Sequence, residues 1–241
     1  GWNWIGFNSN GYLSPDEAFA GLEPQTGDVI KGRNAFAMFM DYEWVGSLTA
    51  LTPGEGYVYM SNDDQTKTFC YPSIAGRSMR APMQTEGDQP KYTACDEHKY
   101  QGNMTMIAKV IMDGEPLDCE LAVFDSNGEC RATGMSQSDN LIFLTIQGEG
   151  YGEQLSFRVV FPFLGKETDV LASETYIFSN DDIAGTPDAP FIINLSEGSG
   201  IGDIEIDATD EPMYDVLGRR VKKDNPVTGV YIRGNEKVLI K

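Results

Sequence analysis

Apolar and polar residues alternate along residues 104–195, and this alternation constrains the fold more than any other feature of the chain. Leu155, Phe157, Val159 and Phe161 are separated by single residues, and a period of two is the signature of a half-buried β-strand. The block 141–146 is mostly apolar and is typical of a central strand covered on both faces. Further strand patterns are found at 104–112, 121–124, 129–132, 175–178 and 191–195. About seven short strands separated by turns predict an antiparallel β-sandwich over residues 103–195.

The dipeptide Asn127-Gly128 predicts a tight turn between two of these strands. Both residues tolerate the positive φ angles of a type I′ turn, so a β-hairpin is expected here. In such a hairpin Cys130 would lie opposite Asp125.

The four cysteines do not define a metal site or a single disulfide pattern. None of them forms a C-x-x-C pair, so no zinc site is expected. Cys119 lies well down the strand that precedes the hairpin turn, so direct pairing of Cys119 with Cys130 is not favoured. A Cys70–Cys95 disulfide and free buried thiols remain as the alternatives.

Residues 1–71 carry shorter patterns that predict a small α+β module. Ser14 can cap a helix, Pro15 suits its first position and Glu17 completes a capping box. The helix is expected over 15–23, and its inward-facing residues would be Ala18, Phe19 and Leu22. Strands are expected at 28–31, 35–39, 43–46, 56–60 and 66–69. The opening residues also alternate, with Trp2 and Trp4 on one face and Ile5 and Phe7 on the other.

Two stretches without a sustained period separate the parts of the chain. Residues 72–102 and 196–212 are rich in Pro, Gly and polar residues, and both are expected to be linkers. His98 is the only histidine, and without a neighbouring nucleophile or ligand set it is interpreted as an ordinary surface residue. Residues 213–241 form a short β tail, in which a small antiparallel set of three strands is predicted.

Charge and hydropathy exclude several partners. A net charge of −19 and a pI near 4.3 repel phosphate backbones and anionic membrane surfaces, so nucleic-acid binding is not expected. No stretch approaches the roughly 18–20 apolar residues of a membrane span. Because the chain begins at Gly1 without Met, we expect it to be a piece of a longer protein.

The chain lacks the motifs on which catalysis usually depends. There is no G-x-S-x-G elbow, no histidine cluster for metal hydrolysis, and the glycines of 198–202 precede no helix that could bind a phosphate. We therefore predict no enzyme, no catalytic residues, no metal site and no cofactor. Calcium is kept open, since residues 62–64, 125–127 and 180–182 are rich in oxygen ligands, although Asx turns explain them as well.

Aromatic residues in the first 71 positions are the candidates for a ligand site. Exposed aromatic faces with polar neighbours commonly stack on the apolar faces of sugar rings. The alternative is that these residues form the core of a small domain, which needs large side chains to bury enough area. The candidates are Trp2, Trp4, Tyr42, Trp44, Tyr57 and Tyr59.

Two parts of the chain resemble known bacterial domains. The phrases ELAVFDSNGECRATG (120–134), NLIFLTIQGEGYGEQLSFRV (140–159) and IFSNDDIAGTPDAPFIINL (177–195) resemble an immunoglobulin-like domain common in large surface proteins of Bacteroidetes. The phrases GWNWIGF, GDVIKGRNAFAMF and EWVGSLTALTPGEGYVYMSN, all within 1–72, resemble a repeat found in secreted bacterial proteins. Both resemblances imply an extracellular or outer-surface location and an architecture, but no chemistry.

The tail resembles a C-terminal sorting signal of the type IX secretion system of Bacteroidetes. The resemblance lies in YDVLGRRV and GVYIRGNEKVLIK, and it implies the secretion machinery as a partner. The matching tail, about 45 residues with its linker, is shorter than a complete sorting domain. The matching positions are Gly218, Arg219, Gly229, Tyr231, Ile232, Lys237, Val238 and Lys241.

Together these patterns predict a mainly β, non-enzymatic C-terminal region of a bacterial surface or secreted protein that serves as a spacer, in adhesion and in secretion sorting. The alternative is a carbohydrate- or host-protein-binding module that uses the aromatic residues of 1–71. A third interpretation is a pure spacer that holds an upstream domain away from the membrane.

Overall fold

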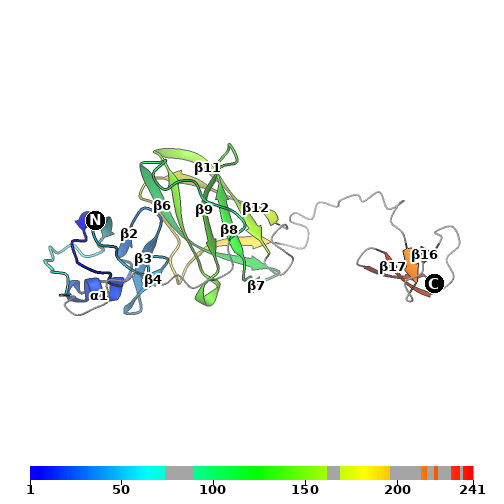
Figure 1. The fold of residues 1–241 in the computed structure, drawn as a ribbon, viewed down its shortest axis with the longest axis horizontal. Coiled ribbons are helices and arrows are strands. Elements are labelled where there is room, and N and C mark those ends of the chain that lie inside the picture. Colours follow the sequence, from blue (N-terminus) through cyan, green and yellow to red (C-terminus); the bar gives the residue numbers. More distant parts are fainter. Residues whose placement is uncertain are drawn as a thin grey trace. The chain divides into compact units, whose positions relative to one another are not determined.

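The computed structural model describes residues 1–73, 90–161 and 169–195, and the backbone of short strands within 213–240. The chain divides into two compact units, Gly1–Gly200 and Ile201–Lys241 (Figure 1). The described residues are mainly β, with mostly antiparallel sheets. None of the described helices is both long enough and apolar enough to cross a membrane.

The first 60 residues form a five-stranded antiparallel sheet. Its strands lie in the order β1-β5-β2-β3-β4. Their bounds are β1 Trp2–Gly6, β2 Val29–Lys31, β3 Phe36–Met40, β4 Glu43–Gly46 and β5 Gly56–Met60. The strands expected from the sequence in this region are confirmed, except that 66–69 is not a strand. Phe69 instead packs its ring against Phe19 and Tyr71, so an apolar side chain that suggested a strand belongs to a loop covering the core.

The helix of this region begins as its capping box requires. The Glu17 N–H donates to Ser14 Oγ, and the Ser14 N–H donates to a Glu17 carboxylate oxygen, both at 3.2 Å. Helix α1 spans Pro15–Phe19 and continues as the 3₁₀ helix η1, Ala20–Leu22. The predicted inward positions Ala18, Phe19 and Leu22 are buried. The helix therefore covers one face of the five-stranded sheet.

Two further sheets enclose the largest hydrophobic core. The first contains β6 Gly102–Met112, with β10 Ile142–Gly148, β7 Glu115–Pro116, β13 Ile183–Ala184 and β14 Phe191–Leu195 all pairing with β6. The second has the order β12-β11-β8-β9, with bounds Asp169–Ser179, Tyr151–Val160, Glu120–Phe124 and Cys130–Met135. Most pairs are antiparallel, but β13 and β14 each run parallel to β6.

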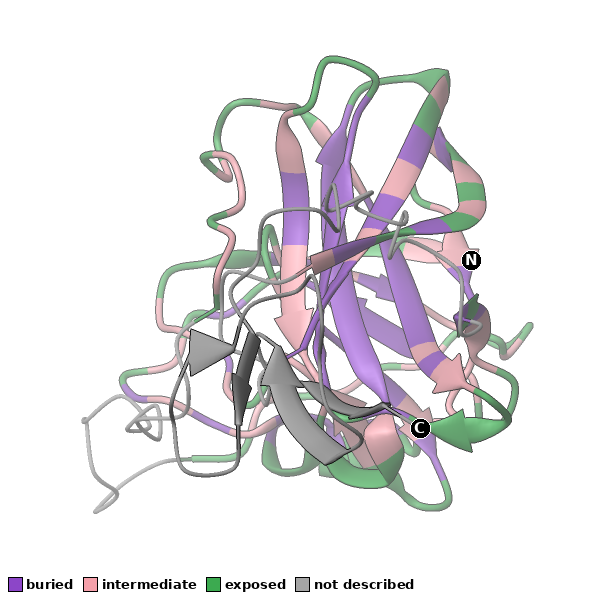
Figure 2. Ribbon diagram, turned by 90° about the vertical axis from the view of Figure 1, so that its right-hand side faces the viewer, coloured by how far each residue is buried: buried purple, intermediate pink, exposed green. Residues whose placement is uncertain are grey.

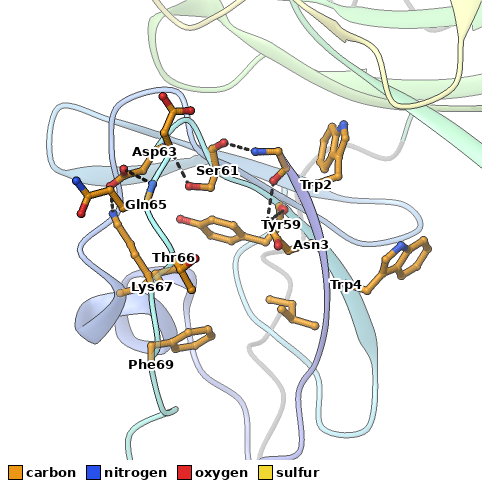
Figure 3. Close-up of a pocket in the computed structure, with 14 residues that line it drawn as sticks. Trp2, Asn3, Trp4, Tyr59, Ser61, Asp63, Gln65, Thr66, Lys67 and Phe69 are labelled. Atoms are coloured by element: carbon orange, nitrogen blue, oxygen red, sulfur yellow. Dashed lines mark hydrogen bonds and ion pairs between the residues drawn. The ribbon is translucent and has the colours of Figure 1, made fainter.

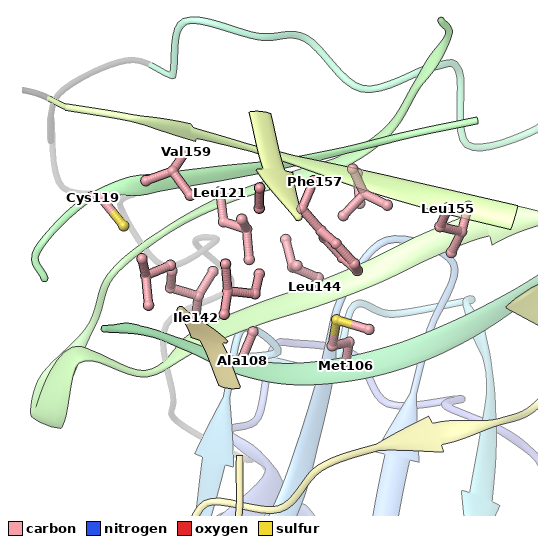
Figure 4. Close-up of a cluster of buried hydrophobic side chains, with 14 of the residues drawn as sticks. Met106, Ala108, Cys119, Leu121, Ile142, Leu144, Leu155, Phe157 and Val159 are labelled. Carbon is pink, nitrogen blue, oxygen red and sulfur yellow. The ribbon is translucent and has the colours of Figure 1, made fainter. Parts of the chain in front are cut away.

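Side chains from these two sheets meet in one cluster. Met106 and Ala108 of β6 and Ile142 and Leu144 of β10 lie in the same core as Leu121, Leu155, Phe157 and Val159 of the second sheet (Figure 4). Buried positions are concentrated along these strands, as Figure 2 shows. Leu155, Phe157 and Val159 are fully buried. The alternation along 155–161 therefore correctly predicted the face of this strand that points into the core.

The opposite face of β6 and β10 packs against the N-terminal sheet. Ile107, Leu141 and Phe143 share a buried cluster with residues of β2 and β3, among them Val29 and Phe36. The Phe36 and Phe143 ring centroids are 5.9 Å apart. This explains why 141–146 is apolar on both faces, although β10 is an edge strand of its sheet and not the central strand that the sequence suggested.

The β8–β9 hairpin is present, but its turn is not the expected type I′ turn. Among its residues only Gly128 has a positive φ, of 80°. The N–H groups of Asn127 and Glu129 both donate to Asp125 Oδ1, at 2.9 and 2.8 Å, so the Asp125 side chain organises the turn. A register irregularity follows, and Cys130 faces Phe124 and not Asp125 as expected.

Part of the predicted first linker lies against the second sheet. Glu120 is buried and accepts from the N–H groups of Lys91 and Tyr92, while the Cys95 N–H donates to the Cys130 carbonyl at 2.8 Å. Residues 90–101, named here the 90–101 segment, are thus held by hydrogen bonds along β8 and β9. The rest of that linker, 74–89, and the whole of the second linker, 196–212, lie outside the described residues.

The second unit contains a four-stranded antiparallel sheet in the order β16-β15-β17-β18. Its bounds are β15 Met213–Asp215, β16 Arg220–Val221, β17 Gly229–Arg233 and β18 Glu236–Ile240, one strand more than expected. Among the residues that match a sorting signal, Gly229, Tyr231 and Ile232 lie in β17, and Lys237 and Val238 lie in β18. Gly218, Arg219 and Lys241 lie outside the described residues.

Candidate functional site

Three of the six candidate aromatic residues belong to the core. Tyr57 and Tyr59 are buried, and Trp44 is half-buried with its ring 6.0 Å from that of Tyr59. The Tyr59 hydroxyl donates to Asp28 Oδ2 at 2.6 Å. Burial, followed by this hydrogen bond, raises the pKa of Tyr59, so the phenol stays a donor. These three residues have the placement of core side chains, which was the alternative that the sequence offered.

The two most exposed candidates, Trp4 and Tyr42, cannot form one platform. Trp4 is 85% exposed on β1, and Tyr42 is 95% exposed in the turn between β3 and β4. Strands β1 and β4 are the opposite edges of a five-stranded sheet. At about 4.8 Å per strand the two edges are about 19 Å apart, so a ligand site would use one residue or the other.

Trp4 shares its face of the sheet with a buried lysine. Trp4 pairs with Val58 across β1 and β5, and Val58 pairs with Lys31 across β5 and β2, so the three side chains lie side by side. Trp2, on the same face of β1, packs beneath the Lys31 ammonium, whose nitrogen is 4.8 Å from the ring centroid. This is the face that meets the β6 and β10 sheet.

A cleft of about 350 Å³ opens where this face meets the central strands. Polar groups from five separate parts of the chain surround it, while the exposed indole of Trp4 forms an aromatic wall. Its lining includes Trp4, Arg33, Glu55, Tyr100, Gln101, Asn103, Gln147, Asn180 and Asp181.

The floor of the cleft is an ion pair between distant segments. Lys31 Nζ lies 2.6 Å from Asp181 Oδ1 and also donates to the Asn103 carbonyl at 3.3 Å. Burial lowers the pKa of Lys31, while the hydrogen bond and the charge of Asp181 oppose that shift. Because Asp181 is more than half exposed, its carboxylate remains accessible from the cleft.

The hairpin between β2 and β3 is fixed against the central strands by amide side chains. Asn103 Nδ2 donates to the carbonyls of Gly32 and Arg33, at 3.1 and 3.0 Å, and Gln147 Nε2 donates to the same Arg33 carbonyl. The Arg33 side chain is exposed and has no ion-pair partner among the described residues. The cleft therefore has a fixed backbone wall and one cation that remains available to a ligand.

A larger cavity, of about 460 Å³, lies on the other side of β1. Figure 3 shows Tyr59, Thr66, Lys67 and Phe69 on one side of the strand, and the indoles of Trp2 and Trp4 on the other. Lys67 in this cavity already pairs with Asp63 at 3.0 Å. Size alone would favour this cavity, which Trp2 and Trp4 also line. The Trp4 side chain lies on the sheet face that it shares with Val58 and Lys31, however, and we place the candidate site in the smaller cleft on that face.

Two of the three oxygen-rich loops that kept calcium open contain Asx turns, at Asp63 and Asp125. Asp63 Oδ1 accepts from the Gln65 N–H at 2.9 Å, and the Asp182 carboxylate accepts from the Tyr176 hydroxyl at 2.9 Å. The Asp125 carboxylate is used by the β8–β9 turn and by Arg131. Within the part of the chain that the structure describes, no three His, Cys, Asp or Glu residues are grouped so that they could hold a metal ion.

Sequence patterns did not single out the polar half of the cleft. Lys31 and Asp181 are separated by 150 positions and Gln147 and Arg33 by 114, so only tertiary contact brings them together. One signal was present, namely a lysine inside an apolar strand pattern at 28–31. A lysine is almost never fully buried unless it is paired, so burial of Lys31 would require an acidic partner elsewhere in the chain.

In comparisons with known proteins, no family model, no curated protein and no solved structure matched this chain.

Proposed function

We propose that residues 1–195 form an extracellular, non-enzymatic carbohydrate-binding region, with the ligand in the cleft beside Trp4. The observation that carries this proposal is an indole with 85% exposure standing at a polar cleft. An indole offers a large flat apolar face at little conformational cost, and the apolar face of a sugar ring stacks on it.

The polar lining suits the hydroxyl groups of the same ligand. Arg33 and Asn180 supply donors, and Glu55 and Asp181 supply acceptors, all from side chains that line the cleft. A carbohydrate ligand needs both kinds of group around one aromatic face. Host-protein binding at this cleft remains an outcome of the test, since Trp and Arg are also typical anchors of protein interfaces.

A glycan array probed with wild-type chain and two variants tests the proposal. Trp4→Ala is expected to lower the signal of the bound glycans at least tenfold, because it removes the stacking face while leaving the core intact. Tyr42→Ala, at the other edge of the sheet, is the matched control and is expected to keep wild-type binding. If Tyr42→Ala lost glycan binding and Trp4→Ala retained it, the ligand would bind elsewhere than in this cleft. If the folded wild-type chain bound no glycan on the array, the proposal would be rejected.

We propose a second role for the whole chain, as a spacer and adhesion region with a sorting tail. In this proposal residues 103–195 are an immunoglobulin-like sandwich, residues 1–71 are a small α+β module, and 213–241 is read by the secretion machinery of a Bacteroidetes cell. The supporting observation is that five of the residues that resemble a sorting signal lie on two paired strands, β17 and β18.

A reporter carrying residues 196–241 tests the sorting role in a host that has the type IX system. The fused reporter is expected at the cell surface, whereas a reporter ending at residue 212 is expected to remain inside the cell envelope. Equal surface amounts of the two reporters would contradict the sorting role without affecting the carbohydrate proposal.

A further inference from the structure

Cys95 and Cys130 are brought together by the fold, although neither pairing considered from the sequence joins them. The Cys95 N–H donates to the Cys130 carbonyl at 2.8 Å. Antiparallel residues that exchange both backbone hydrogen bonds have Cα atoms about 5.5 Å apart, which falls inside the range that a disulfide spans, and Cys95 and Cys130 share one such bond. Both residues are partly buried, and all four described thiols are free in the structure.

Contacts on both sides of Cys95 fix this juxtaposition. Before it, the N–H groups of Lys91 and Tyr92 donate to the buried Glu120 carboxylate. After it, the Tyr100 hydroxyl donates to Glu129 Oε2 at 2.6 Å, and Lys99 pairs with the same carboxylate. The 90–101 segment is thus held on β8 and β9 at both ends, so Cys95 does not move freely past Cys130.

Burial raises the pKa values of both thiols. Burial raises the pKa of Cys130 to about 11, and the neighbouring Cys95 adds to that rise. Burial, followed by the charge of Glu129, also raises the pKa of Cys95. Two mostly protonated thiols react slowly, so the reduced pair persists until an oxidant is supplied.

The other two cysteines are placed away from this pair. Cys119 is fully buried and lies opposite Ser136, whose hydroxyl accepts from the Cys119 N–H at 3.0 Å. Cys119 and Cys130 are therefore separated by several residue positions along the β8–β9 ladder. Cys70 is exposed in the loop that follows β5.

We infer that Cys95 and Cys130 are a disulfide-forming pair that fastens the 90–101 segment to strand β9. A thiolate of the pair attacks a small-molecule disulfide, forming a mixed disulfide and releasing one thiolate. The second cysteine attacks the mixed disulfide, forming the Cys95–Cys130 bond and releasing the second thiolate. Two electrons pass to the small disulfide, and the protons of the two cysteines leave with the released thiols.

Oxidised glutathione, incubated with the full folded chain, is the probe that tests the inference. Non-reducing digestion and mass spectrometry should show Cys95 linked to Cys130, with loss of two titratable thiols. Cys95→Ser and Cys130→Ser should each abolish this link, while Cys70→Ser and Cys119→Ser should leave it unchanged. The oxidised wild type should melt at a higher Tm than the reduced protein, and Cys95→Ser should show no such difference.

Other patterns of oxidation would overturn the inference. These are a link from Cys95 to Cys70, mixed glutathione adducts on Cys95 and Cys130 without a link between them, or no reaction of either thiol. The peptide map of the wild type alone decides among these outcomes, so a variant that fails to fold does not weaken the test.

Discussion

At the scale of single residues, Arg131 is a buried charged group held by several partners. Its guanidinium is only 4% exposed, contacts Asp125 Oδ2 through Nε at 3.2 Å and Nη2 at 2.8 Å, and stacks 3.9 Å from the Tyr100 ring centroid. Removal of one partner from a buried pair costs about 3–5 kcal/mol when the other charge loses its compensation, and here Glu153 at 3.0 Å and Glu129 at 3.4 Å still pair with Arg131, which favours the lower end of that range. Asp125→Asn should therefore lower the free energy of unfolding at pH 7 by about 3 kcal/mol, measured by urea denaturation.

The same carboxylate predicts a pH dependence. Burial acts to raise the pKa of Asp125, but the hydrogen bonds from Arg131 and from the Glu129 and Asn127 N–H groups outweigh it and lower the pKa. Because the folded pKa lies below the unfolded value of about 3.9, this stabilisation is present above about pH 4 and is lost as the pH falls through the folded pKa. Asp125→Asn should lose less stability than wild type between pH 4 and pH 2, and the exposed Asp188→Asn control should follow wild type.

At this scale, the sequence predicts a residue's role when that role depends on neighbours within a few positions, and not when it depends on distant segments. The capping role of Ser14 and the inward direction of Phe19 follow from neighbours within a few residues, and both are confirmed. The pairing of Cys95 with Cys130 depends on a segment that has no periodic pattern, so sequence reasoning could not find it. The exposure of Trp4 and the burial of Tyr59 likewise depend on tertiary contacts, since Trp4 lies on an edge strand and Tyr59 packs against Phe19 of the helix on the other face of the sheet.

At the scale of elements, α1 depends on its cap to an unusual degree. The helix has five residues, so propagation along it contributes little and its first hydrogen bonds fix its position. Ser14→Ala removes the Oγ that accepts from the Glu17 N–H, and it should cost about 1 kcal/mol in urea denaturation.

Two matched variants separate capping from other effects of the substitution. Ser14→Asp should restore most of the stability, because a carboxylate also accepts from the third helical N–H and favours a helix start. Ser9→Ala, in the preceding loop, should change stability by less than about 0.5 kcal/mol. Equal losses for Ser14→Ala and Ser14→Asp would show that the cap does not control this helix.

Strand existence was largely predictable from the sequence, and strand pairing was not. Alternation located β5 and β11 because each has one buried face, whereas β8 is buried along its whole length. The apolar pattern of β10 also reported burial correctly, but it could not show that the N-terminal sheet, and not a neighbouring strand, provides the cover. The period of apolar residues indicates whether one or both faces of a strand are buried, but it does not indicate which element covers each face.

At the scale of the whole molecule, the shared cluster between the N-terminal sheet and β6 and β10 predicts joint unfolding. Phe36 and Phe143 are both buried in it, and the ion pair between Lys31 and Asp181 joins the same two parts. Residues 1–71 were expected to form a separate module, and among the described residues one face of their sheet shares a buried cluster with Ile107, Leu141 and Phe143 of the strands that follow. We therefore expect the N-terminal sheet and the central strands to lose structure in one transition.

Phe143→Ala tests this coupling from the far side of the cluster. It should lower the free energy of unfolding by about 3–5 kcal/mol and shift two signals together. Tryptophan fluorescence reports the N-terminal sheet, since Trp2, Trp4 and Trp44 are the three tryptophans of the chain, and hydrogen exchange of β11 reports the central core. The half-exposed Leu171→Ala control should move neither signal appreciably. If fluorescence shifts in Phe143→Ala while β11 keeps its protection, the N-terminal sheet unfolds independently and the predicted boundary after residue 71 separates two folding units.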